Sequence, residues 1–286
     1  MSRYLLVYEY PSSSKVIINA PLELEGIETI ANRTRGDISR LILILNERDN
    51  WELFYSLCTD LLRATQKSKT PETASGIILT RLRRWQNFLR SKRANILSEE
   101  KIKGLIGELL FLRDKLTPKY GISNAVNFWQ GPEGSPQDFN INDSSVEVKC
   151  QMGGSIPSVK IQSANQLYTQ LANLYLFVVT MGKSDEGNER ALNLNSLTEQ
   201  IRVSLGNESA TASTRFDDLL LEAGYIYNKK YDEYNYIVTG YNVFHVIDDF
   251  PRITPDEIKQ GVMRVSYQIR LADCSPYEIS IDKWEI

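Results

Sequence analysis

The sequence predicts a mixed α/β (α+β) fold, in which helices flank a mixed central sheet, with an N-terminal α+β extension. Three observations predict this class. Residues 174–179 (LYLFVV) are apolar on both faces, as a buried central strand is. Residues 137–141 and 146–149 alternate in polarity on either side of the turn-forming residues 142–145. Residues 99–116 combine strong helix formers with an N-cap at Ser98.

Two domains are expected, over residues 1–95 and 96–286. In the first, strands are predicted over 4–10, 15–20 and 40–45, and helices over 51–65 and 74–93. In the second, strands are predicted over 145–152 and 174–181, and loops over 182–187 and 206–214. Later helices should start near Ser163 and Asn195, and another should cover 216–223, followed by further strands. The spacing of Ser163 and Gln166 fits a capping box.

The two alternating segments carry acids at positions that depend on the loop between them. Asp138 lies on the first strand, and Glu147 and Lys149 lie on the second. A loop with an even number of residues puts all three on one face of the hairpin, whereas an odd number sends Asp138 to the other face. Phe139, together with the apolar residues of both strands, favours the even register. Two carboxylates beside an ammonium suit a hard cation and metal-assisted hydrolysis.

Glu108 is a third carboxylate, and it points from a mostly apolar arc of the predicted helix 99–116. A carboxylate on such a face must be paired, protonated or bound to a metal. Removing an unpaired charge from water costs on the order of several kcal/mol. Two interpretations are open: Glu108 joins the hairpin acids, or it pairs with a basic residue in the core. Gly104 and Gly107 leave room beside it for another backbone or a ligand.

These motifs together resemble the PD-(D/E)XK phosphodiesterase superfamily. The resemblance rests on GELLFL (107–112), Trp-x-Gly-Pro (129–132), Asp138-Phe139, Glu147-Val148-Lys149 and Ser163-x-x-Gln-Leu, and covers residues 98 to about 250. It is closest to a bacterial branch that is often found near restriction and phage-defence genes. The pattern departs at Gln137, which stands where proline is usual, with Pro136 one place earlier.

The resemblance implies a restriction-endonuclease-like core and a divalent metal, Mg²⁺ with Mn²⁺ as a substitute. It implies that Glu108, Asp138 and Glu147 bind the metal. Lys149 would orient the attacking water and stabilise developing charge. Gln166 is an accessory candidate, because a polar residue on that helix leans toward the site in some relatives. The helix cap is its alternative role.

Composition excludes several other chemistries. The chain has a single histidine, His245, so Ser-His-Asp, Cys-His and His-rich metal sites are close to excluded, and His245 is expected to be structural. Three distant cysteines argue against a disulfide framework. No apolar run approaches membrane length, and a cytoplasmic location is expected.

The net charge of −3 does not indicate a nucleic-acid binder, but basic residues gather in one acid-free stretch between Glu72 and Glu99. The candidates for nucleic-acid binding are Arg83, Arg84, Arg90, Lys92 and Arg93. The alternative, which the sequence supports equally, is that these residues form an ordinary solvent-exposed helix face. Tyrosines between 225 and 241 could stack on unpaired bases, although ordinary half-buried positions are favoured for them.

The sequence therefore predicts a Mg²⁺-dependent nuclease that cuts nucleic acid, most readily DNA, in restriction or phage defence. A homodimer or partner subunits of a defence system are compatible with it. Two alternatives stay open: a non-catalytic DNA-binding or scaffolding subunit, and an RNase. The presence of all four polar positions favours catalysis, since a binding role needs none of them.

Overall fold

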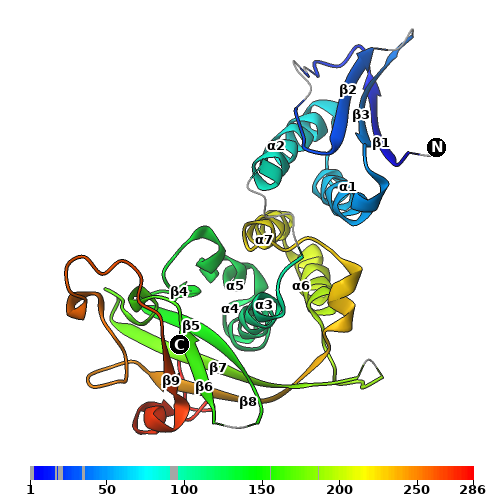
Figure 1. Ribbon diagram of the computed structural model, residues 1–286. Coiled ribbons are helices and arrows are strands. Elements are labelled where there is room, and N and C mark those ends of the chain that lie inside the picture. The colour runs from blue at the N-terminus through cyan, green and yellow to red at the C-terminus, as the bar shows by residue number, and fades with distance from the viewer. Residues whose placement is uncertain are drawn as a thin grey trace. The chain divides into compact units, whose positions relative to one another are not determined.

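A computed structural model describes residues 3–16, 18, 22–33, 36–90, 96–154, 156–185 and 187–286. The chain divides into two compact units (Figure 1). The first comprises Met1–Ile96 with Leu220–Lys229, and the second comprises Leu97–Leu219 with Lys230–Ile286. Residues 220–229, expected in the second domain, group with the first unit because Leu221 and Ile226 belong to its core.

The first unit is a three-stranded antiparallel sheet packed against two helices. The strands are β1 (Leu5–Pro11), β2 (Ile27–Arg33) and β3 (Ile38–Leu45), in the order β1-β3-β2. The helices are α1 (Trp51–Thr65) and α2 (Pro71–Arg90). Alternate residues of β3, Leu41, Leu43 and Leu45, face the core that the helices complete with Leu57 and Leu82.

Most of the expected elements of this unit are present, with two corrections. Strand β2 was not predicted, and no strand forms at residues 15, 16 and 18. The rest of the expected strand 15–20, and residues 91–93 of the expected helix 74–93, lie outside the described residues. Helix α2 also begins three residues earlier than expected, at Pro71, which suits a first helical position.

The second unit is built on a mixed five-stranded sheet, which confirms the predicted fold class. Its order is β10-β8-β7-β5-β4, and only the β5–β7 pair is parallel. The strands are β4 (Phe139–Ile141), β5 (Ser144–Met152), β7 (Asn173–Lys183), β8 (Tyr236–His245) and β10 (Glu278–Ile279). The predicted buried strand is β7, at the centre of the sheet, with residues 174–179 buried.

Helices cover one face of this sheet, and a small two-stranded sheet covers part of the other. The helices of the unit are α3 (Glu99–Phe111), which continues through a π-helical turn (Leu112–Leu116), α4 (Thr117–Tyr120), α5 (Ile122–Phe128), α6 (Leu194–Glu208) and most of α7 (Ala210–Glu222). Figure 1 shows α3, α4 and α5 together on one side of the sheet. Strands β6 (Ser158–Ile161) and β9 (Tyr267–Arg270) share a core with Leu176 and Val178.

Two expectations for this unit are wrong. Residues 206–214 are not a loop, because α6 runs to Glu208 and α7 starts at Ala210, with Gly206 inside a helix. No α-helix starts at Ser163. Residues Ala164–Leu167 form a single 3₁₀ turn, and Ser163 makes no capping hydrogen bond through its side chain.

Candidate active site

The hairpin β4–β5 has the even register that a common face requires. Phe139 pairs with Val146 and Ile141 pairs with Ser144, so the loop is the two residues Asn142 and Asp143. Asn142 has a φ of 53°, a left-handed conformation that asparagine tolerates better than most residues. Extending the pairing by one residue places Asp138 opposite Glu147. The parity prediction is confirmed.

Asp138 is fixed at the start of β4 by its carboxylate and by its carbonyl. Its Oδ2 accepts a hydrogen bond from the backbone N–H of Val148 at 2.8 Å. Its carbonyl accepts from the N–H groups of Gln130 and Gly131, at 2.8 and 3.0 Å. A side chain on Gly131 would not fit, because a Cβ there would lie 2.9 Å from Asp138 Oδ1 and 3.1 Å from its Cα.

Glu147 and Lys149 form a buried ion pair on β5. The Lys149 Nζ lies 2.5 Å from Glu147 Oε1, and the side chains are 15% and 1% exposed. Within the part of the chain that the structure describes, Glu147 Oε2 has no hydrogen-bond partner, and Oε1 has none besides the Lys149 ammonium. A buried carboxylate whose lone pairs are left to one ammonium can accept further positive or donor groups, so it suits a hard cation.

Burial holds the acids of the hairpin away from their charged forms, and for Glu147 repulsion by Asp138 adds to this effect. Burial raises the pKa of Glu147 well above its usual range, the charge of Asp138 adds to this, and Lys149 opposes it. Burial also raises the pKa of Asp138, against the opposing effects of Lys149 and the Val148 N–H. Burial lowers the pKa of Lys149, but the carboxylates led by Glu147 outweigh it, so the pKa is raised and the ammonium persists.

Glu108, on α3, interacts electrostatically with Asp138 and Lys149. The indole Nε1 of Trp129 donates a hydrogen bond to Glu108 Oε2 at 2.8 Å. Burial raises the pKa of Glu108 to about 8, Asp138 adds to the shift, and Trp129 and Lys149 oppose it. Among the described residues Glu108 forms no ion pair with a core Arg or Lys, which was the alternative interpretation.

The helix is pressed closely onto the strand that carries Glu147. A Cβ on Gly107 would lie 2.2 Å from the Sγ of Cys150, and its next nearest neighbour, a methyl of Val148, would lie at 3.5 Å. Glycine is therefore what lets α3 carry Glu108 so near β5. As they stand, no three His, Cys, Asp or Glu side chains of the described segments form a ready-made metal cage. The site is a group of neighbouring acids around one ammonium.

The comparison with protein families fits this geometry. A model described as "Putative PD-(D/E)XK family member" (DUF4420) matches residues 2–272. The chain belongs to this family. No curated protein matches the chain, and no solved structure does. In the described parts of this PD-(D/E)XK chain, no helix has the length and apolar character needed to cross a membrane.

The sequence did not predict the contacts of two residues at this candidate site. Trp129 was noted only as part of a motif, and its bond to Glu108 joins residues 21 positions apart. Gln137, the residue directly before Asp138, is 4% exposed. Its Nε2 donates to the carbonyls of Asn165 and Tyr168, at 2.6 and 2.9 Å. In the sequence, the only sign that Gln137 has a structural role is that a polar residue stands directly before a short, apolar strand.

Gln166 makes a local contact. Its Oε1 accepts a hydrogen bond from the N–H of Gln162 at 2.7 Å, so the expected capping box with Ser163 does not form. The tyrosines that could have stacked bases are buried or half-buried. The hydroxyl of Tyr231 accepts from the N–H of Leu97, and that of Tyr241 donates to Asp114. The ring of His245 stacks on Tyr175 at 4.9 Å.

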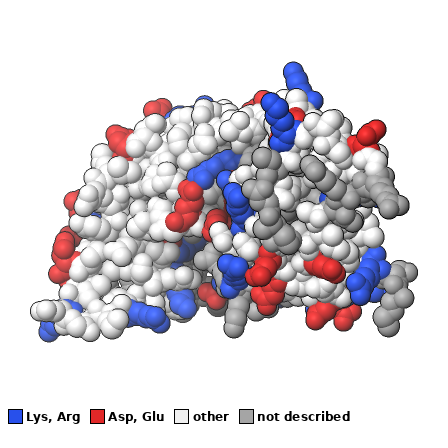
Figure 2. Space-filling model, turned by 90° about the horizontal axis from the view of Figure 1, so that it is seen from above, with Lys and Arg blue, Asp and Glu red and all other residues white. Residues whose placement is uncertain are grey.

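The basic residues of α2 belong to the first unit, and the acids belong to the second. Arg83, Arg84 and Arg90 are exposed, whereas Lys92 and Arg93 lie outside the described residues. Arg81 is buried, and its guanidinium donates to Asp60. In Figure 2 basic and acidic side chains are interspersed over a largely uncharged face, in keeping with the small net charge.

Proposed function

We propose that the chain is a metal-dependent nuclease that cleaves DNA in restriction or phage defence. Membership of the PD-(D/E)XK family supports a nuclease. The observation that carries the proposal is the buried carboxylate of Glu147. Within the described residues it has only the Lys149 ammonium beside it, with Asp138 opposite on the same face.

Asp138 and Glu147, with Glu108 beside them, are the residues that would hold the metal. Oxygen ligands suit Mg²⁺, and Mn²⁺ accepts the same set. A bound divalent ion supplies polarisation of the phosphate and a water of lowered pKa. Binding of positive charge would also favour the charged forms of these acids, which burial now disfavours, and would relieve the repulsion that Asp138 exerts on Glu147.

Lys149 has a role that follows from its charge. Its pKa is raised by the surrounding acids after burial is taken into account, so it is protonated at neutral pH. A protonated amine cannot accept the proton of the attacking water. It can donate hydrogen bonds to that water and stabilise the negative charge that develops on the phosphate.

The test is cleavage of supercoiled plasmid, single-stranded DNA and RNA by the purified chain with Mg²⁺, Mn²⁺ or EDTA. We expect DNA products with metal and none with EDTA. Asp138→Ala and Glu147→Ala should lower the rate by at least about a hundredfold, as loss of a group that acts on the reacting atoms does. Their melting temperatures are measured alongside, because each change removes one of several like charges but also the partner of a buried group: Glu147 pairs with Lys149, and Asp138 accepts from the Val148 N–H.

Glu189→Ala, at an exposed position, is the matched control and should cleave normally. Undiminished cleavage by either site variant would refute the site. Metal-independent binding of DNA without any cleavage by the parent would favour the non-catalytic subunit, and cleavage restricted to RNA would favour the RNase.

A further inference from the structure

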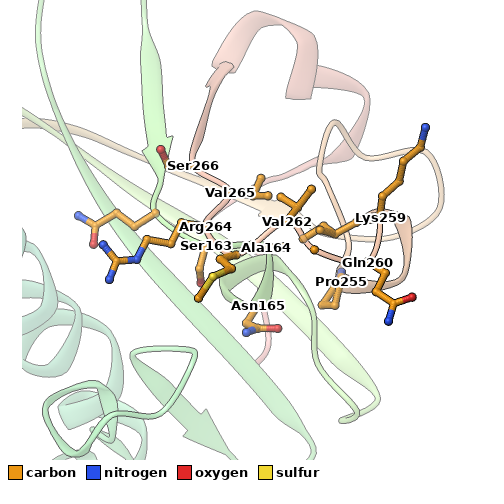
Figure 3. A pocket seen from close by; sticks show the side chains of 14 residues that line it. Ser163, Ala164, Asn165, Pro255, Lys259, Gln260, Val262, Arg264, Val265 and Ser266 are labelled. Carbon is orange, nitrogen blue, oxygen red and sulfur yellow. The ribbon is translucent and has the colours of Figure 1, made fainter.

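A groove of about 580 Å³ lies beside the 3₁₀ turn of residues 164–167 (Figure 3). Residues 162–165 form one wall, and Pro255 and residues 258–266 form the other. The volume is in the range of sites that enclose small organic ligands, so it takes a segment of one nucleic-acid strand but not a duplex.

The lining of the groove is positive and partly apolar. Lys259 and Arg264 line it, and no acid does. Within the described residues neither forms an ion pair, and the nearby acid Glu257 is engaged by the N–H and hydroxyl of Thr254. In Figure 3 the charged ends of Lys259 and Arg264 point away from one another, from opposite ends of the lining. Met263, on the same wall, is 92% exposed.

One wall of the groove is joined to the segment that carries Asp138. Gln137, directly before Asp138, fastens the first wall through the carbonyl of Asn165. The second wall ends at Ser266, next to Tyr267. Tyr267 begins β9, which pairs with β6. The first wall of the groove therefore lies beside the segment that leads into Asp138.

We propose that this groove binds a single-stranded nucleic-acid segment next to the phosphate that the site attacks. The inference rests on the proposed function and adds the substrate's binding surface. Lys259 and Arg264 would contact backbone phosphates at the two ends of the bound segment, because they are cations without an ion pair among the described residues and lie at the two ends of the groove. The thioether of Met263 would lie against a base, as exposed apolar side chains do in other nucleic-acid complexes.

The test is oligonucleotide binding measured by fluorescence anisotropy in EDTA, in a Glu147→Gln background that does not cleave. Labelled single-stranded DNA, duplex DNA and RNA of one sequence are compared over a series of salt concentrations. The variant Lys259→Ala/Arg264→Ala is compared with Arg190→Ala/Lys283→Ala, which removes the same charge from exposed positions outside the groove.

We expect the groove variant to bind single strands about tenfold more weakly than its control. The magnitude of its logarithmic salt slope should fall by about 1.4, for two lost phosphate contacts. Met263→Ala should weaken binding with the slope unchanged. Equal affinities and slopes for the two double variants would overturn the proposal, as would a groove effect confined to duplex DNA or no oligonucleotide binding at all.

Cleavage by the unmodified chain is measured separately, so the two proposals can fail independently. Groove-dependent binding without metal-dependent cleavage supports the groove and refutes the nuclease. Metal-dependent cleavage without any effect of the groove variant on binding supports the nuclease and refutes the groove.

Discussion

At the scale of single residues, the acids of the site are held where their neutral forms are favoured. Glu108 is the clearest case, since its pKa is raised from 4.5 to about 8, first by burial and then by Asp138. A group whose pKa is higher in the folded state than in the unfolded state stabilises the fold while it is protonated. That stability is complete below about pH 4.5 and is lost as the pH rises through about 8.

We therefore expect the metal-free protein to lose stability between about pH 5 and pH 8. The melting temperature in EDTA should fall over this window, and Glu108→Gln should flatten the fall, because the amide does not titrate. The difference between the two proteins should amount to a few kcal/mol at pH 8, at about 1.4 kcal/mol per pKa unit. Glu189→Gln serves as the control. Parallel pH profiles for Glu108→Gln and the parent would contradict the assigned pKa.

Sequence reasoning at this scale went as far as local periodicity allows. The period of two along a strand predicts that Glu147 and Lys149 share a face, and loop parity adds Asp138. Periodicity carries no information on the Trp129–Glu108 hydrogen bond or on the three carbonyls that Gln137 contacts. Those partners are distant in sequence and meet only when the sheet and its helices are assembled.

At the scale of elements, the contact between α3 and β5 depends on the absence of one side chain. Gly107→Ala would gain up to about 1 kcal/mol in helix propensity but force a methyl against the Cys150 sulfur, at an overpacking cost of about 1–3 kcal/mol. We expect a net loss of stability. In Gly107→Ala/Cys150→Ala the sulfur is gone, and the nearest remaining atom is 3.5 Å away.

The double variant should therefore be more stable than the sum of the single changes predicts. Urea unfolding of the parent, both single variants and the double variant gives the coupling free energy directly. Gly104→Ala is the control, because a Cβ there meets nothing within 4 Å, and it should not couple to Cys150→Ala. Additive effects at Gly107 and Cys150 would rule out the steric explanation.

The elements that the sequence mispredicted are those with weak local signals. Glycine at 206 suggested a loop, yet α6 passes through it, because buried positions such as Leu205 hold the helix in place. The capping-box spacing at Ser163 suggested a helix, but the segment turns once and is held by Gln137 instead. In both places packing against other parts of the unit outweighs a local preference.

At the scale of the whole molecule, charge is arranged without a strong overall bias. The net charge is −3, so any attraction to nucleic acid would depend on local clusters of basic residues. The exposed arginines of α2, Arg83, Arg84 and Arg90, are one such cluster, and Arg81 is excluded from it by its bond to Asp60. The composition of the sequence identified the cluster, but only burial separates Arg81 from its neighbours.

We expect the triple change Arg83→Gln/Arg84→Gln/Arg90→Gln to weaken DNA binding and to flatten its salt dependence. Electrophoretic mobility shifts at several salt concentrations measure both quantities. Neutralising Arg48, Lys67 and Lys69, which are exposed elsewhere in the same unit, changes the net charge equally and should leave the slope as it was. If both triple variants behave alike, α2 is an ordinary solvated face.

The Cys150 sulfur, which lies against Gly107, also offers a chemical probe of the contact between α3 and β5. Burial raises the pKa of the Cys150 thiol to about 12, so very little reactive thiolate exists while α3 lies on β5. The side chain of Cys150 is nevertheless partly exposed. In a chain without Cys58 and Cys274, the rate of its modification by a thiol reagent would therefore report on the packing of α3, which bears Glu108, against β5, which bears Glu147.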